Sequence, residues 1–201
     1  MKTQNYILKN KKIPCIILAR KGSKSLKNKN LIKLNNKPLI QHSIDYAKKS
    51  KFITNVVVST DDLRIFKIAK KHKCFCIYPR PKNLSGDYAK TEPALIHALK
   101  VFEKEFGKTD YYSYLQVTEP LRPKNILDKC IKNILSDSKI DSSFAGYVLH
   151  KNFWKKTGKK IKRISGNSNT NTPRQKKPPV YREDTGVALA SKSIILKKYK
   201  K

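Results

Sequence analysis

The chain contains few acidic residues. Among its 201 residues, 14 are Asp or Glu and 46 are Lys or Arg, which gives a formal net charge of +32. Such an imbalance attracts anionic partners, from nucleic acid to phosphorylated small molecules. The lysines, however, are spread along the whole chain, without an arginine-rich arm or a basic stripe interleaved with aromatic residues. We therefore disfavour nucleic acid as the main partner and retain an attraction for anionic small substrates.

Long apolar runs and paired cysteines are also missing. No apolar run approaches the length of a membrane span, and the first residues, MKTQNYILKNKK, contain no apolar stretch typical of a signal peptide. The four cysteines form no Cys-x-x-Cys pair, which indicates reduced thiols used for packing. These absences predict a cytoplasmic protein without a membrane partner, and the length predicts a single domain spanning residues 1–201.

Strand-like and helix-like patterns alternate four times along the chain. The run from Ile13 to Ala19 is apolar and uncharged, as in a strand buried on both faces of a parallel sheet. Further strands are predicted at 54–60, 74–78, 111–117 and 142–149, with helices near 39–49, 62–69, 95–102 and 126–135. This alternation predicts an α/β fold with a mostly parallel sheet and helices on both faces.

The first strand leads into a loop that is rich in lysine and poor in glycine. Residues 20–30 contain four lysines, while Gly22 is the only glycine. No Gly-Lys-Ser/Thr closes the loop, so it is not a Walker A motif, and a single glycine excludes a dinucleotide fingerprint. Backbone N–H groups and ammonium groups there could surround a phosphate. A solvated lysine-rich turn explains the pattern equally well.

Composition changes at His150. Residues 152–175 are rich in Lys, Gly, Asn, Ser and Thr with little periodicity, so a polar excursion or small subdomain is predicted at about 150–175. A last apolar stretch, Gly186 to Ala190 with Ile194 to Leu196, predicts one more strand and a closing turn.

Ligands of parallel sheets bind beyond the carboxyl ends of the strands. The residues expected there lie at 20–30, 60–62, 80, 87–91 and 116–122. Each has a simpler interpretation: Asp61 and Asp62 could only cap a helix, Arg80 could be a surface residue between prolines, and Thr118 could cap a turn.

Seven segments, in order, carry a family resemblance: LARKGSKSLKNKN, LNNKPLI, VVVSTDD, PRP, GDYAKTEPALIHAL, LQVTEPLR and PRQKKPPVYREDTG. From Ile13 to about Leu196 the chain resembles the cytidylyltransferases that make CMP-activated acidic sugars, the CMP-N-acylneuraminate (sialic acid) synthetases. The resemblance implies a three-layer α/β/α nucleotidyltransferase fold, Rossmann-like and similar to glycosyltransferase A. It also implies transfer of CMP from CTP to a nonulosonic sugar, with release of pyrophosphate.

The resemblance also implies roles for individual residues. Catalytic cations are Arg20, Lys24 and Lys29, and Arg20 can hold phosphate oxygens bidentately. The nucleotide is expected against Ala19, Gly22, Ser23, Asn30, Arg80, Ala89 and Thr91. The acidic sugar is expected against Gln116, Arg174 and Tyr181, with Arg174 facing its carboxylate. Mg²⁺ is the implied cofactor, and its ligands stay open among Asp61, Asp62, Asp87 and Asp184. A homodimer is also left open.

Three departures from the family pattern affect these expectations. Relatives often have proline and glycine where this chain has Lys27 and Asn28. Kdo-transferring relatives have a metal-binding aspartate where this chain has Thr118, which disfavours that subclass. Typical synthetases also continue to a segment with closely spaced aspartates, so a shortened relative that binds CTP or a partner with weak or no turnover is the alternative. A basic nucleic-acid-binding protein is a remote alternative.

Overall fold

The computed structural model describes residues 11–23, 26–165 and 173–198. It divides the chain into two compact units. The first unit extends to Ala145 and resumes at Thr185, and the second is Gly146–Asp184. The predicted polar excursion at about 150–175 falls inside the second unit, and its residues 166–172 lie outside the described ones.

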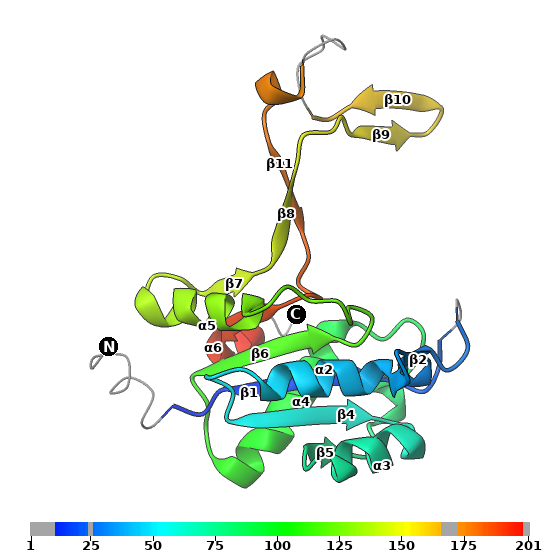
Figure 1. Ribbon diagram of the computed structural model, residues 1–201, viewed down its shortest axis with the longest axis vertical. Helices are drawn as coiled ribbons and strands as arrows, with labels where there is room; N and C mark the ends of the chain where they lie inside the picture. The colour runs from blue at the N-terminus through cyan, green and yellow to red at the C-terminus, as the bar shows by residue number, and fades with distance from the viewer. Residues whose placement is uncertain (1–10, 24–25, 166–172, 199–201) are drawn as a thin grey trace. The chain divides into compact units, whose positions relative to one another are not determined.

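The first unit is built on a six-stranded sheet with the order β5-β4-β1-β6-β12-β7 (Figure 1). Its strands are β1 (Pro14–Ala19), β4 (Asn55–Thr60), β5 (Phe75–Ile77), β6 (Tyr111–Gln116), β7 (Ser142–Phe144) and β12 (Leu189–Lys192). β5, β4, β1 and β6 are parallel, whereas β12 runs antiparallel to both β6 and β7. The prediction of a mostly parallel sheet is therefore confirmed.

Helices cover both faces of this sheet. They are α2 (Leu39–Lys48), α3 (Leu63–Lys71), α4 (Thr91–Phe106), α5 (Ile126–Ser136) and α6 (Ser193–Lys198). Ile17 and Val58 pack with α2, α3 and α5, whereas their strand neighbours Ile16 and Val57 pack with α4 and α6. Each central strand is thus buried on both faces, as its unbroken apolar sequence requires. Three layers result, α/β/α, as predicted.

Short elements connect these layers. They are η1 (Lys29–Leu31), β2 (Lys33–Leu34), β3 (Lys37–Pro38) and η2 (Lys82–Leu84).

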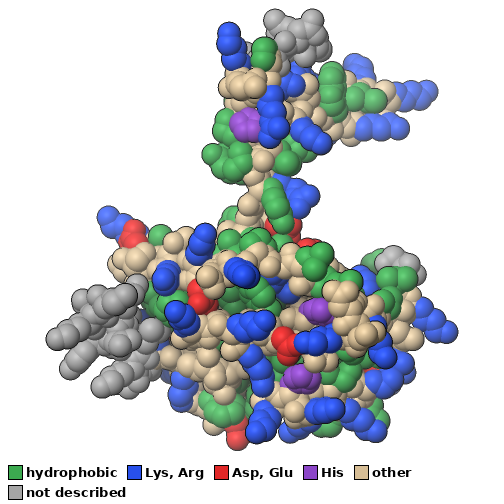
Figure 2. Space-filling model, in the orientation of Figure 1, with side chains coloured by type: hydrophobic (Ala, Val, Ile, Leu, Met, Phe, Trp, Pro, Cys, Tyr) green, Lys and Arg blue, Asp and Glu red, His purple; other side chains and the backbone are tan. Residues whose placement is uncertain are grey.

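None of the four described cysteines forms a disulfide, in agreement with packing thiols. Basic side chains are distributed over the visible face rather than gathered in one patch (Figure 2). Within the described residues, no helix is both long enough and apolar enough to cross a membrane.

The strand predicted at 142–149 is wrong as a single element. It is divided at Ala145, whose N–H donates to the carbonyl of Ala188. β7 ends before this point and pairs with β12, whereas β8 (Gly146–Leu149) pairs with β11 (Val180–Glu183). A Cβ on Gly146 would lie 3.1 Å from the carbonyl oxygen of Arg182, so glycine permits the close approach of these two strands.

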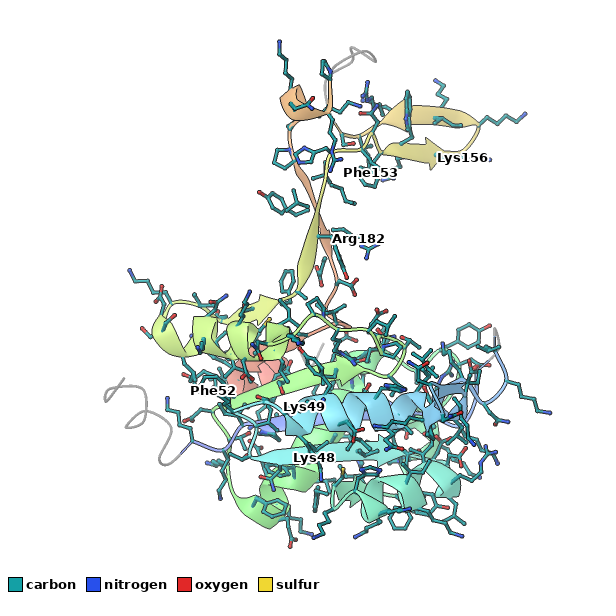
Figure 3. All side chains as sticks on the ribbon, viewed as in Figure 1. Lys48, Lys49, Phe52, Phe153, Lys156 and Arg182 are labelled. Atoms are coloured by element: carbon teal, nitrogen blue, oxygen red, sulfur yellow. The ribbon has the colours of Figure 1, made fainter. Side chains whose placement is uncertain are left out.

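The second unit contains two antiparallel strand pairs, β8 with β11 and β9 (Trp154–Thr157) with β10 (Lys160–Arg163). η3 (Arg174–Lys176) precedes β11. Arg182 of β11, which is labelled in Figure 3, lies over the ring of Tyr147, 4.7 Å from its centroid. β9 and β10 are rich in lysine and show no clear alternation of apolar and polar residues, so the sequence did not predict these two strands.

Two boundaries near the C-terminal end also differ from the sequence prediction. The strand expected at Gly186–Ala190 begins at Leu189 and continues to Lys192. The expected closing turn is the short helix α6, whose Leu196 packs in the core cluster beside α4.

Candidate active site

The parallel strands β1, β4, β5 and β6 end at the same edge of the sheet, and the segments that follow β1, β5 and β6 line one cavity. Many of the predicted site residues meet there: Arg20, Gly22, Ser23, Lys29, Asn30, Arg80, Ala89, Thr91 and Gln116. The cavity wall also contains Leu18, Leu84, Gly86, Lys90, Ala94, Tyr114, Val117 and Thr118. Loops that are far apart in the sequence thus form one cationic cavity.

Arg20 ties the loop after β1 to the segment before α4. Its Nη1 atom donates to the carbonyl of Gly86 and to Oδ1 of Asp87, each at 2.9 Å. Asn30 holds the same loop, because its Nδ2 donates to the carbonyl oxygen of Arg20 at 2.9 Å. The guanidinium is therefore positioned before any substrate binds, with Nη1 engaged by protein oxygens.

The two consecutive aspartates after β4 have different roles. Oδ1 of Asp61 accepts the backbone N–H of Lys21 at 2.8 Å, which fixes the start of the lysine-rich loop at residues 20–30, the predicted phosphate loop. Asp62, 3% exposed, caps α3 by accepting the N–H of Arg64 at 2.9 Å, and its Oδ2 lies 2.7 Å from Nη2 of Arg64. The capping interpretation thus holds for Asp62, which leaves it poorly placed to bind a metal.

Arg64, which the sequence did not indicate, also reaches the phosphate loop. Its Nη2 donates to Oδ1 of Asn28 at 2.9 Å. Asn28 has a φ of 54°, a left-handed conformation that asparagine tolerates better than most residues. This backbone conformation explains how asparagine can stand where relatives often have glycine.

Replacing Asp62 tests whether this residue only caps α3 or also takes part in activity. We expect Asp62→Ala to lower the free energy of unfolding by about 1 kcal/mol, as other N-cap losses do, and to change kcat/KM only a few-fold. The hydrogen bond from Arg64 lowers the pKa of Asp62, so the stabilisation is present above its unfolded pKa and is lost as pH falls through the folded pKa. Urea unfolding at neutral pH and near pH 3 measures both effects, with Asp62→Asn, which retains a capping oxygen, as control.

Arg80 is a buried cation at the cavity. It is 4% exposed, and its N–H donates to the carbonyl of Thr60 at 2.8 Å. Its Nε donates to Oγ of Ser85 at 3.1 Å, and its Nη2 lies 3.8 Å from Oδ1 of Asp61. Burial lowers the pKa of Arg80, against the opposing effect of Asp61, yet an arginine stays protonated. The surface interpretation of Arg80 is therefore wrong.

Gln116 is held by the chain where it re-enters the first unit. Its N–H donates to the carbonyl of Gly186 at 2.9 Å, and a Cβ on Gly186 would collide with Oε1 of Gln116. Arg122 completes this arrangement: Nη2 donates to the carbonyls of Gln116 and Gly186, Nε to that of Val187 at 2.8 Å, and Nη1 to Oγ of Ser43 at 3.2 Å. Burial lowers the pKa of Arg122.

The four aspartates considered for Mg²⁺ are not gathered in one place. Asp62 caps α3, Asp87 pairs with Arg20, and Asp184 pairs with Arg182 at 3.0 Å in the second unit. Among the described residues, no three His, Cys, Asp or Glu side chains form a metal cluster. Asp61 and Asp87 do line a second cavity together with the loop residues Gly22 and Ser23. Two carboxylates suit an ion held mainly by substrate phosphates, so these two fit Mg²⁺ best.

The remaining predicted site residues lie elsewhere. Lys24 falls outside the described residues. Ala19 is 0% exposed, and its side chain belongs to the core beneath the loop rather than to the cavity wall. Arg174 begins η3 and Tyr181 lies on β11, both in the second unit, so their contact with a sugar stays a prediction.

Sequence reasoning missed Tyr114. The stretch around it was treated only as a strand, although the period of two places Tyr112, Tyr114 and Gln116 on one face of β6. Gln116, at the end of that strand, was predicted as a site residue. Because Tyr114 lies two residues earlier on the same face, the alternation of the strand could have identified it as well.

The fold and the cavity define a nucleotidyltransferase-type α/β protein. A solved CMP:2-keto-3-deoxy-manno-octonic acid synthetase in complex with CTP has the same fold, with a TM-score of 0.68, 21% identity and coverage of 94% of this chain and 77% of that one. A family model described as cytidylyltransferase matches residues 14–196. The chain therefore belongs to the cytidylyltransferase family, as the resemblance indicated.

Two curated relatives come from Campylobacter. A pseudaminic acid cytidylyltransferase of Campylobacter jejuni is 37% identical over 123 residues, which cover 61% of this chain and 53% of the relative. The post-translational flagellin modification protein B of Campylobacter coli is 31% identical over 190 residues, covering 92% of this chain and 79% of that protein. The match thus spans about half the length of the first relative.

Proposed function

We propose that this protein transfers CMP from CTP to a nonulosonic, sialic-acid-like sugar and releases pyrophosphate. The supporting observation is the single cavity at the strand ends, where Arg20, Lys29 and Arg80 meet Gln116 in a chain of the cytidylyltransferase family. A triphosphate and an acidic sugar both carry negative charge, which a cationic cavity attracts.

The cavity residues support an in-line displacement. The anomeric hydroxyl of the sugar attacks the α-phosphorus and loses its proton to solvent, the bond from the α-phosphorus to the oxygen that bridges it to the β-phosphorus breaks, and pyrophosphate leaves with that oxygen. Arg20 and Lys29 stabilise the charge that develops on the phosphate oxygens, and the backbone N–H groups near Gly22 can add hydrogen bonds. Mg²⁺, held by Asp61 and Asp87, would neutralise phosphate charge.

Gln116, at the end of β6, is the residue of the first unit that we expect to contact the sugar. Arg174 and Tyr181, in the second unit, keep the roles that the resemblance implies, with Arg174 as a partner for the sugar carboxylate. The names of the relatives favour pseudaminic acid as the first candidate, with sialic and legionaminic acids as close alternatives.

A pyrophosphate-release assay tests this proposal directly. The full chain is mixed with CTP, Mg²⁺ and one of pseudaminic, legionaminic or N-acetylneuraminic acid. We expect release that depends on both CTP and one of the sugars. Saturable CTP binding without release with any sugar would favour the binding-only alternative. Affinity for duplex DNA that falls steeply with salt, without a CTP site, would favour the nucleic-acid alternative.

Arg174→Lys tests the sugar subsite. Lysine keeps the charge but loses the planar fork that binds a carboxylate through two hydrogen bonds. We expect the KM for the sugar to rise roughly tenfold, while the KM for CTP changes little. Steady-state kinetics with each substrate varied in turn measures both constants. Equal increases in the two KM values would show that Arg174 does not contact the sugar specifically. No change in either KM would show that it is an unpaired surface arginine.

A further inference from the structure

β6 directs two tyrosines to the face of the sheet that α4 covers. Tyr112 and Tyr114 are 4% and 7% exposed, and both belong to the core cluster that contains Ile16 and Val57. A buried phenol is nearly always hydrogen-bonded, because leaving its hydroxyl without a partner costs free energy. The two residues therefore allow a comparison within one strand.

The two hydroxyl groups have different surroundings. Tyr112 is paired with Ser191 of the adjacent strand β12 and does not line the cavity of the candidate active site. Tyr114 has no hydrogen-bond partner among the residues that the structure describes, and its side chain lines the cavity of the candidate active site. A side chain that is more than nine-tenths buried thus presents a polar group without a protein partner to the space where substrate would bind.

The neighbours of Tyr114 indicate which part of the cavity it serves. Thr91 and Ala94, in the first turns of α4, line the same cavity as Tyr114, together with the buried cation of Arg80. Arg80 and Thr91 are positions that we expect beside the nucleoside. Gln116, expected beside the sugar, lies at the end of the strand, two residues beyond Tyr114. Tyr114 therefore belongs to the nucleoside end.

We infer that the hydroxyl of Tyr114 donates a hydrogen bond to an acceptor on the nucleoside of CTP, which makes Tyr114 a nucleotide-binding residue. This inference rests on the proposed function, since it takes CTP as the ligand. Burial raises the pKa of Tyr114 to about 12, so the phenol keeps its proton near neutral pH and is available as a donor.

Tyr114→Phe removes the hydroxyl alone, and Tyr112→Phe is the matched control on the same face of the same strand. Calorimetric titration of each full-length variant with CTP measures binding without turnover, and a thermal scan measures folding. We expect Tyr114→Phe to weaken CTP binding about 3- to 10-fold, the loss of one hydrogen bond, with an unchanged or higher Tm. Tyr112→Phe should keep CTP affinity, because Tyr112 does not line the cavity.

The outcomes separate this inference from the proposed function. If the wild-type chain binds CTP and Tyr114→Phe binds it equally well, the inference is overturned while the proposed function stands. A change confined to the KM for the sugar also overturns it, since the phenol would then serve the other end of the cavity. If the wild-type chain does not bind CTP, both fail. If it binds CTP without transferring CMP, the affinity of Tyr114→Phe still decides the inference.

Discussion

Arg20→Ala is expected to lower kcat/KM by roughly 10²–10³ and to leave the fold intact. The side chain follows a buried strand, is about one-third exposed and contributes little to the core. A charge-assisted contact with phosphate oxygens strengthens as charge develops in the transition state, and losing it costs on the order of 2–4 kcal/mol. Pyrophosphate release at subsaturating CTP measures the loss, and circular dichroism checks the fold.

Two further variants show how Arg20 acts. Arg20→Lys keeps the charge without the fork and should recover only part of the rate. Asp87→Asn weakens the ion pair, in which Nη1 and Oδ1 lie 2.9 Å apart, and also removes a proposed Mg²⁺ ligand, so its defect, unlike that of Arg20→Ala, should shrink as the Mg²⁺ concentration is raised. Near wild-type kcat/KM for Arg20→Ala would show that the loop does not bind the triphosphate, even if Asp87→Asn were impaired.

The sheet and its helices could be predicted from the sequence because their signals are local. An uncharged run such as Pro14–Ala19 has no alternative to a strand buried on both faces, and α5 shows its periodicity openly. The second unit gave no such signal. β9 and β10 are exposed strands with lysines on both faces of the pair: Lys155 lies opposite Lys162 on one face, and Lys156 lies opposite Ile161 on the other. Exposed strands of this kind have no apolar alternation to detect.

The candidate site was only partly predictable, since burial depends on residues that are distant in the sequence. Arg80, between two prolines, has the local sequence of a surface turn, yet the segment reaching Ser85 encloses it. Asp61 and Asp62 are adjacent and chemically identical, but one fixes the phosphate loop and the other caps a helix. Only the three-dimensional contacts separate these roles.

The role of Arg122 also depends on contacts that are distant in the sequence. Its replacement is expected to lower the stability of the protein strongly. Its guanidinium donates to oxygen atoms of Ser43, Gln116, Gly186 and Val187, which come from three separate segments. Hydrogen bonds from a charged donor contribute roughly 1.5–3 kcal/mol each, and carbonyls left buried without a donor add a penalty. We therefore expect Arg122→Ala to lower the free energy of unfolding by about 3 kcal/mol or more.

The same change should displace Gln116, because its carbonyl and that of Gly186 lose their shared donor. The KM for the sugar should then rise more than that for CTP in the fraction that remains folded. Urea unfolding is best followed by far-ultraviolet circular dichroism, because the only tryptophan, Trp154, lies in the second unit and would report on the wrong part of the chain.

Arg182→Ala is the matched control for this measurement. Arg182 is also an arginine with a carboxylate and an aromatic neighbour, but its side chain is 59% exposed. Its removal should cost about 1 kcal/mol or less, as for other exposed ion pairs. If Arg122→Ala lowers the free energy of unfolding no more than Arg182→Ala does, the Arg122 guanidinium does not hold the loop after β6 against the segment at Gly186 and Val187. Gln116 would then be positioned by the Gly186 carbonyl and by the absence of a side chain at Gly186 alone.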